Sequence, residues 1–273
     1  MTTRLFTWNI VIYVLLFILA LFFLVPFAWM LTNAFKPTIE IVELRLLPSR
    51  LTLEHFIKLS SSTEIWRNAF NSFFVSSVVT CCSLLFSSMV AYGLAKIDFP
   101  GRKVLFVVIS ATLLIPGSLV LIPKIMIIDQ LNWINTYYAL IVPAMVSPYN
   151  VFFFRQFFMG IPMDLNHSAF IDGASQFDIY TKIILPLAKP ALITLGILQF
   201  LATWDDFMWP LLVTNTDEMR TLPVVVATLA NEYDVNLGEV MTIGSITAVP
   251  IIIVYSFLQK HFVNGLVTGG LKM

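Results

Sequence analysis

Long runs without a charged residue constrain this chain more than any other feature. Five such runs cover residues 5–35, 68–95, 104–123, 131–154 and 240–259. A helix needs about 20 predominantly apolar residues to cross the hydrocarbon core of a bilayer, and each run has that length. A sixth stretch, 191–213, is interrupted only by Asp205 and Asp206. The chain therefore has the pattern of a protein that crosses a membrane several times.

The same runs predict an all-α membrane protein. Only helices and closed barrels satisfy every backbone polar group in lipid, and apolar runs of this length without alternation indicate helices. The first run is too long for the apolar part of a secretory signal and no cleavage site follows it, so we expect an uncleaved first span. We expect a single transmembrane domain, 1–273, with six helices at about 8–31, 69–96, 104–128, 137–158, 191–213 and 240–260.

Two patterns inside these spans concern helix packing. Ser83, Ser87, Ala91 and Ala95 recur every four residues, which gives one helix face of small side chains. Such faces allow close helix association in lipid, although small residues are also common there by chance. The third span carries Pro116-Gly117, where we expect the helix to break.

The distribution of basic residues indicates the orientation. With six spans both termini lie on one side, and placing them in the cytoplasm puts nine of the 16 Lys and Arg residues inside. The short inner loops hold them more densely than the outer segments do, as the positive-inside rule requires. The formal net charge is zero, which argues against a nucleic-acid partner.

A polar loop at 162–190, between the fourth and fifth spans, has helix signals of its own. Asp164 is expected to cap a short helix over residues 165–171, and Asp172-Gly173 should end that helix. A connection of about 30 residues with its own helices is unusual for a mere link.

The second half of the polar loop predicts another helix. Ser175 and Asp178 have the Ser-x-x-Asp spacing of a capping box, and the helix should continue through Ile184. Pro186 and Pro190 are expected to stop it and to start the fifth span.

The polar loop resembles the inner-loop signature of permease subunits in binding-protein-dependent ABC importers. The pattern is Glu-Ala-Ala, Asp-Gly-Ala and then Ile-x-Leu-Pro, and the residues that match it in register are Ala169, Asp172, Gly173, Ala174, Ile183, Leu185 and Pro186. The segments AYGLAKIDFPGRKVLF, TWDDFMWPLL and LQKHFVNGLVTGGLKM resemble the carbohydrate-uptake branch, especially the maltose-type smaller permease. The chain departs from the family pattern in two places. His167 stands where the family has glutamate, and Ser168 stands in place of its first alanine. Trp204 is followed by Asp205 and Asp206, where the family usually has Trp-Asn followed by an acidic residue.

The resemblance implies a two-helix cytoplasmic coupling loop that docks on an ATPase subunit. The residues expected at that contact are Leu165, His167, Ser168, Ala169, Phe170, Asp172, Gly173 and Ala174. An amphipathic helix pair on lipid headgroups is the alternative, but its polar face would normally be basic, whereas Asp164, Asp172 and Asp178 are acidic.

The resemblance also implies the partners. They are a second permease subunit, two ATPase subunits and an extracytoplasmic substrate-binding protein, in the cytoplasmic (inner) membrane of a prokaryote. The chain would be a translocation subunit and not an enzyme, with no bound cofactor, and ATP and Mg would bind the partner ATPase. His55, His167 and His261 are scattered, so no metal site is expected.

Five residues are candidates for the substrate pathway. Aromatic faces beside carboxylates suit sugar rings, and ionisable groups near a span are functional candidates. An interfacial aromatic belt with solvated acids is the alternative. The candidates are Asn150, Trp204, Asp205, Asp206 and Trp209.

The resulting prediction is a permease of an ABC importer for a sugar, oligosaccharide or related polyol. The alternative is a stand-alone secondary transporter of a small polar solute. Such a transporter would often need ion-coupling carboxylates at mid-span, and the span centres are charge-free.

Overall fold

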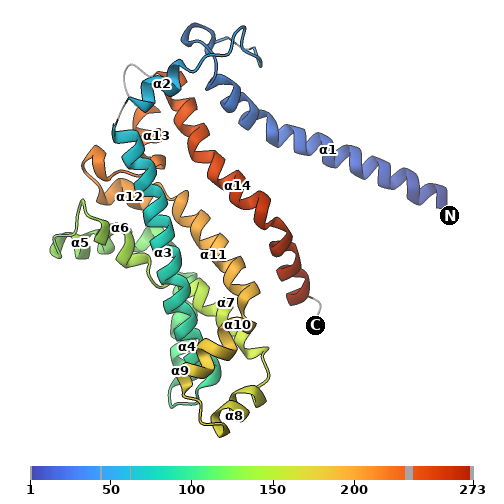
Figure 1. The fold of residues 1–273 in the computed structure, drawn as a ribbon, viewed down its shortest axis with the longest axis vertical. Coiled ribbons are helices and arrows are strands. Elements are labelled where there is room, and N and C mark those ends of the chain that lie inside the picture. The colour runs from blue at the N-terminus through green and yellow to red at the C-terminus, as the bar shows by residue number, and fades with distance from the viewer. Residues whose placement is uncertain (1, 44, 62, 231–235, 271–273) are drawn as a thin grey trace. The chain divides into compact units, whose positions relative to one another are not determined.

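The computed structural model describes residues 2–43, 45–61, 63–230 and 236–270, and within them the fold is all helical. The described chain has no β-strand, which confirms the all-α part of the predicted fold class. Figure 1 shows its α-helices. Short 3₁₀ turns and a π turn lie between some of them along the chain. The final residues of the C-terminal segment that carries part of the resemblance, 271–273, lie outside the described residues.

The chain divides into two compact units. The first comprises Met1–Trp66 and Val225–Pro250, and the second comprises Arg67–Val224 and Ile251–Met273. Three helices cross from one unit into the other along the chain: α3 (Thr63–Lys96), α13 (Leu222–Ala230) and α14 (Leu237–Gly270).

The first unit contains α1 (Thr2–Asn33), a 3₁₀ turn η1 (Thr38–Glu40) and α2 (Glu54–Ser60). The apolar side chains of α1 are exposed from Val11 to Phe27, as expected for a helix whose solvent is lipid. The helix α2 packs on the start of α14, where the buried His55 lies against Gly238 and Lys58 forms an ion pair with Glu239.

The second unit is built around α3, α7 (Pro148–Met159) and α11 (Lys189–Trp204), which lie side by side in Figure 1. A core cluster joins them through Leu94, Phe154, Phe158, Ile184 and Leu195. The small-residue face of α3 packs inward as predicted, with Ser83, Ser87 and Ala91 fully buried and Ala95 half-buried against the core cluster. The amide of Ser147 donates to the hydroxyl of Ser87 at 3.1 Å, so α3 and the start of α7 approach closely.

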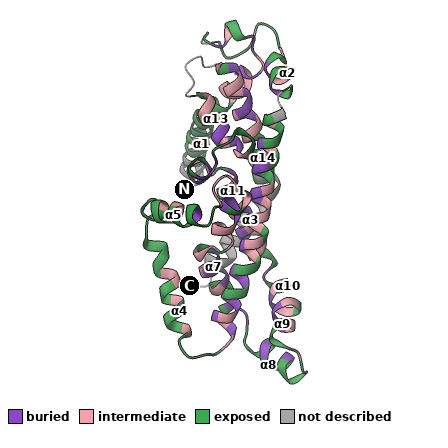
Figure 2. Ribbon diagram, turned by 90° about the vertical axis from the view of Figure 1, so that its left-hand side faces the viewer, coloured by how far each residue is buried: buried purple, intermediate pink, exposed green. Residues whose placement is uncertain are grey.

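The third predicted span is broken as expected. A helix α4 (Arg102–Ala111) and a turn η2 (Thr112–Leu114) precede Pro116, and a turn η3 (Gly117–Val120) and α5 (Leu121–Gln130) follow it. The two halves are bent by 99°. Both α4 and α5 are exposed over most of their surface (Figure 2).

Two further spans also contain breaks. The fourth consists of α6 (Tyr137–Ile141), a turn η4 (Val142–Ala144) and α7, and the fifth continues past Trp204 into α12 (Met208–Val213). A turn η6 (Asp217–Met219) follows. Among the residues that the structure describes, the helical segments long and apolar enough to cross a bilayer are Val11–Asn33, Glu64–Lys96 and Tyr137–Met159. The two bent pairs raise the number found there to as many as 5. Leu237–Ile253 is a shorter apolar helix, so the count of six spans stays a prediction.

The structure corrects two details of the polar loop. Asp164 is not the N-cap of the helix α8 (Asp164–Ile171): Met163 is, already in helical conformation and without a side-chain hydrogen bond. Asp164 instead lies in the first turn, where its negative charge interacts favourably with the positive end of the helix dipole.

The second correction concerns Pro186. The helix that begins with α9 (Gln176–Ile179) continues through a π turn η5 (Tyr180–Ile184) and through Pro186 into α10 (Leu185–Leu187). Proline has no amide hydrogen to donate to the preceding turn, and the wider π turn before Pro186 accommodates that missing hydrogen bond. The helix therefore continues through Pro186. The chain bends by 79° between Leu187 and Lys189, and Pro190 then lies in the first turn of α11, as predicted.

Candidate functional site

The polar loop forms two short helices joined by a tight turn. Gly173 has φ of +84°, a left-handed conformation that glycine adopts without strain. Its amide donates to the carbonyl of Phe170 at 3.1 Å, and the amide of Ala174 donates to that of Ala169 at 3.0 Å. These two bonds make a Schellman C-cap for α8, so the predicted break at Asp172-Gly173 is confirmed.

The capping box at the start of α9 is also confirmed. The amide of Asp178 donates to the hydroxyl of Ser175 at 3.1 Å, and the amide of Ser175 donates to the carboxylate of Asp178 at 3.2 Å. Lys182 adds an ion pair with Asp178 at 2.6 Å. The capping box therefore fixes the residue at which the second helix starts.

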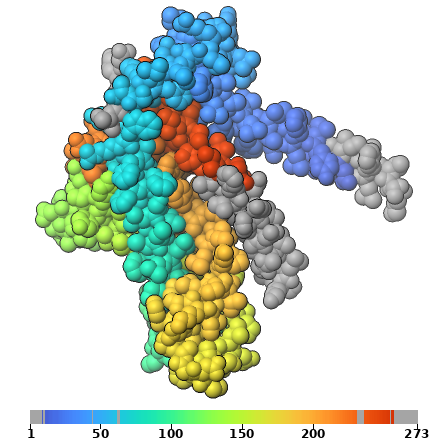
Figure 3. Space-filling view, in the orientation of Figure 1, coloured from blue at the N-terminus to red at the C-terminus, as the bar shows by residue number. Residues whose placement is uncertain are grey.

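The tip of the polar loop presents apolar side chains. Phe170 is 64% exposed, Ile171 84% and Phe177 64%, which is unusual for aromatic and branched residues in a polar segment. Figure 3 shows this loop in yellow as the surface at one end of the second unit. Most of the residues predicted to contact the ATPase are also exposed, namely Leu165, His167, Ser168, Phe170, Asp172 and Gly173. Ala174 is half-buried, and Ala169 packs inward in the core cluster.

Three side chains on one face of α3 hold the polar loop in place. The hydroxyl of Tyr92 donates to the amide oxygen of Gln176 at 2.7 Å, and Ser88 shares a buried hydrogen bond of 2.8 Å with Tyr180. The ammonium group of Lys96, which is buried, donates at 2.6 Å to the carbonyl of Ile161, the residue directly before the loop.

Sequence reasoning missed these contacts although a signal was present. Ser88, Tyr92 and Lys96 are spaced by four, so they share one face of an otherwise apolar helix. Polar side chains repeated along one face inside a membrane helix indicate a hydrogen-bonded partner.

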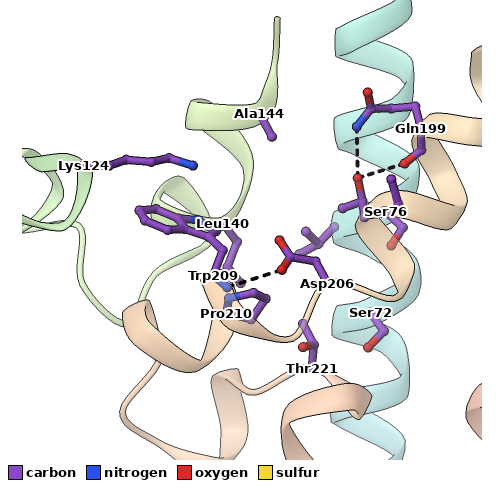
Figure 4. A pocket seen from close by; sticks show the side chains of 13 residues that line it. Ser72, Ser76, Lys124, Leu140, Ala144, Gln199, Asp206, Trp209, Pro210 and Thr221 are labelled. Carbon is purple, nitrogen blue, oxygen red and sulfur yellow. Dashed lines mark hydrogen bonds between the residues drawn. The ribbon is translucent and has the colours of Figure 1, made fainter. Parts of the chain in front are cut away.

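A second site lies where the fifth span is interrupted. The helix α11 ends at Trp204 and α12 begins at Met208, so residues 205–207 lie between them as non-helical backbone. A cavity of about 160 Å³ opens beside this break (Figure 4). Non-helical backbone at membrane depth is tolerated where it lines such a cavity.

Trp209 and Asp206 form one wall of the cavity. The amide of Trp209 donates to the carboxylate of Asp206 at 3.3 Å, and its indole N–H donates to the carbonyl of Ala139 at 2.9 Å. The ammonium of Lys124 lies 3.7 Å from the centre of the Trp209 ring, a cation–π contact. These bonds fix the orientation of the indole.

Three of the five pathway candidates do not line this cavity. Asp205 is exposed, and Trp204 is buried and stacks on Phe200 with ring centres 5.8 Å apart. Asn150 is buried, and its amide donates to the hydroxyl of Ser83 at 2.9 Å and to the side-chain oxygen of Gln199 at 3.0 Å. Asn150 therefore links α7 to α3 and α11.

Lys124 is the lining residue that sequence reasoning overlooked. It follows directly after the charge-free run 104–123 but lies inside the predicted third span, 104–128. A cation placed inside a predicted span is by itself a signal of a functional site. Within the described residues, no group of three or more His, Cys, Asp and Glu side chains could hold a metal ion.

Comparisons with known proteins agree with this architecture. Residues 83–267 match the family described as binding-protein-dependent transport system inner membrane component. The chain is 41% identical over 257 residues to the arabinooligosaccharides transport system permease protein AraQ of Halalkalibacterium halodurans, which covers 90% of each chain. It is 32% identical over 260 residues to the trehalose/maltose transport system permease protein MalG of Thermococcus litoralis, covering 93% of this chain and 94% of the relative.

A solved structure extends the likeness to three dimensions. It is the crystal structure of a bacterial ABC transporter involved in the import of the acidic polysaccharide alginate, and one of its chains aligns with a TM-score of 0.87 and 25% identity. The alignment covers 94% of this chain and 96% of that one. The resemblance to carbohydrate-uptake permeases is therefore confirmed, and the chain belongs to the family of inner membrane components of binding-protein-dependent ABC transport systems.

Proposed function

We propose that the chain forms, with a second permease subunit, an alternating-access pathway for a sugar, oligosaccharide or related polyol. ATP hydrolysis on two separate ATPase subunits drives the cycle, and an extracytoplasmic binding protein delivers the substrate. The names of the two relatives described above support the substrate class, because they refer to arabinooligosaccharides and to trehalose and maltose. In this proposal the chain has six spans in one transmembrane domain, with both termini and the polar loop in the cytoplasm.

The apolar tip of the polar loop carries this proposal. Exposed aromatic and aliphatic residues at a defined turn are what a docking helix offers to a groove in a partner protein. Its acidic residues, Asp164, Asp172 and Asp178, disfavour the alternative of binding to anionic lipid headgroups. Phe170 and Ile171 would therefore lie in the ATPase groove, with His167 and Ser168 beside them.

The contacts of the polar loop explain how movement of an ATPase would reach the pathway. Hydrogen bonds tie the loop to α3, and continuous helix leads from α9 through η5 and α10 to the bend before α11. A displacement of the tip would thus act on α3 and on α11, both of which line the cavity. ATP can shift the permease toward one state only if the contacts of the loop differ between the two states.

Replacing both Phe170 and Ile171 by alanine tests the docking assignment. We expect the variant to insert and fold normally, because both side chains are exposed. The ATPase subunits should be lost during purification and transport should fall at least about tenfold, since buried apolar anchors contribute most of an interface's binding energy.

The matched control is a double replacement of Val42 and Leu47 by alanine. These residues are 80% and 74% exposed in the segment before α2, so the control removes similar exposed apolar area elsewhere. Equal retention of the ATPase subunits by both variants would refute the docking assignment. Transport by the purified chain without any ATPase subunit would instead favour a stand-alone transporter.

A further inference from the structure

Two hydroxyl groups at the cavity have no hydrogen-bond partner. Ser76 is 1% exposed and Thr221 5% exposed, and both line the cavity beside the break between α11 and α12. Neither Oγ of Ser76 nor Oγ1 of Thr221 has a partner within the protein. A buried hydroxyl without a partner destabilises the fold, so these groups are expected to bond with something that enters the cavity.

The size of the cavity limits what can enter. Its volume is about 160 Å³. An apolar cavity of about 150 Å³ in another protein holds one benzene ring, so this cavity has room for about one six-membered ring. Here, however, the polar side chains of Ser76, Gln199, Thr203 and Thr221 replace part of the apolar wall. The lining suits a ring that carries hydroxyl groups.

The apolar part of the lining supports the same ligand class. Val75, Leu140, Ala144 and Pro210 line the cavity together with the indole of Trp209. A sugar ring has C–H groups that pack on such surfaces and hydroxyls that need polar partners. Water in the cavity could bond with the polar side chains but has no apolar groups to pack against the apolar side chains.

The charges at the cavity indicate a neutral ligand. Lys124 and Asp206 both line it, but they do not pair with each other, since Lys124 lies over the ring of Trp209. The cavity thus offers ammonium donors and carboxylate acceptors, with a formal charge that sums to zero. A sugar acid would gain attraction from Lys124 but repulsion from Asp206, whereas a neutral sugar can use both groups.

We propose that this cavity binds one ring of a neutral sugar and so gives this subunit a substrate-binding subsite of its own. Ring hydroxyls donate to Asp206, accept from Lys124 and exchange hydrogen bonds with Ser76 and Thr221. The inference rests on the proposed function as a sugar permease and makes it more specific, because it selects neutral over acidic saccharides.

Equilibrium binding to the assembled transporter in nanodiscs, without the binding protein, tests the subsite. The probes are arabinotriose, maltose and trigalacturonate, and the readout is quenching of tryptophan fluorescence together with a radioligand assay. We expect the wild type to bind at least one neutral probe at least about tenfold more tightly than trigalacturonate, since the acid meets Asp206. The replacement Asp206→Asn should weaken the neutral probe about tenfold, because hydrogen bonds to charged groups are the stronger ones.

Asp205→Asn is the matched control, since Asp205 is exposed and does not line the cavity. A second pair, Ser76→Ala and Thr221→Val, should weaken the binding of neutral probes several-fold while the variants are expressed at the level of the wild type. Unchanged affinity in Asp206→Asn, Ser76→Ala and Thr221→Val overturns the subsite, as does a wild type that binds neither neutral probe or prefers trigalacturonate.

Uptake into proteoliposomes with ATP and the binding protein separates this result from failure of the proposed function. Saccharide uptake that persists in all cavity variants, with unaltered affinity, refutes the subsite alone. Absence of uptake of any saccharide by the wild type refutes the proposed function itself.

Discussion

At the scale of single residues, the contact between Gly238 and His55 shows how little space some positions leave. His55 is buried, and its Nε2 lies 3.0 Å from the carbonyl oxygen of Lys36. A Cβ atom at position 238 would overlap the imidazole ring of His55. Because the hydrogen bond to Lys36 holds the ring, the histidine cannot move aside without losing that bond.

Replacing Gly238 by alanine should therefore destabilise the packing of α2 on α14. Overpacking of a filled site typically costs about 1–3 kcal/mol, which we expect to lower the thermal unfolding midpoint of the purified complex. Gly93→Ala is the control, because a Cβ there has no neighbour within 4 Å and alanine favours a helix. Equal thermal unfolding midpoints for the two variants would show that the side chain of His55 can adopt another conformation without loss of stability.

Predictability at the residue scale differs between the loop and the cavity. The turn at Gly173 and the capping box at Ser175 follow from local sequence, because each is made within a few residues. Lys124 and Thr221 meet at the cavity from distant parts of the chain. Their proximity depends on tertiary packing, which a single sequence does not reveal.

At the scale of elements, α3 connects the polar loop to the rest of the second unit. Its residues Ser88, Tyr92 and Lys96 hold the loop, while Ser72 and Ser76 of the same helix line the cavity. One rigid helix thus contacts both candidate sites. The π turn η5, which begins at Tyr180, is an irregular helical segment of the polar loop before α11, and such turns are frequent at functional sites.

Sequence patterns located most of these elements and some of their breaks. Apolar runs place α1 and α3 because length and hydropathy suffice for a span, whereas α11 reaches that length only together with the bent helix before it. The break at Pro116 is marked by its own residues, whereas the helix through Pro186 survives because of the preceding π turn. A proline therefore predicts a helix end only when the neighbouring backbone cannot adjust.

Removing the hydroxyl of Tyr180 should uncouple ATP hydrolysis from transport. The variant Tyr180→Phe leaves the ring in place but breaks the buried hydrogen bond to Ser88, and a bond of this kind contributes about 1 kcal/mol. We expect several-fold fewer sugar molecules transported per ATP hydrolysed, measured together in proteoliposomes. Tyr92→Phe should act in the same direction through its bond to Gln176.

Tyr149→Phe serves as the control for both tyrosine variants. Tyr149 is 43% exposed and packs on the ring of Phe153 at 4.5 Å, so its ring contact survives the change. An identical ratio of transport to hydrolysis in all three variants would show that the tie between α3 and the polar loop does not transmit the movement.

At the scale of the whole molecule, the fold class and family follow from sequence, but the arrangement of partners does not. The apolar surface of α1 from Val11 to Phe27 must be covered by lipid or protein in the membrane, since exposing so large an apolar surface to water is unfavourable. The orientation rests on the density of basic residues in the inner loops, which is a modest asymmetry of nine to seven. A direct measurement of sidedness is therefore the most useful test at this scale.

Single cysteines at two exposed serines should report opposite sides of the membrane. Ser168 lies in α8 and Ser61 follows α2, and Cys81 and Cys82 would first be replaced by serine to give a background without thiols. We expect a membrane-impermeant maleimide to label Ser168→Cys only in inside-out vesicles and Ser61→Cys only in right-side-out vesicles. Adding the ATPase subunits should protect Ser168→Cys and leave Ser61→Cys reactive, because only the polar loop is proposed to dock. Labelling of Ser168→Cys only in right-side-out vesicles would reverse the assignment of the polar loop to the cytoplasm and with it the coupling mechanism.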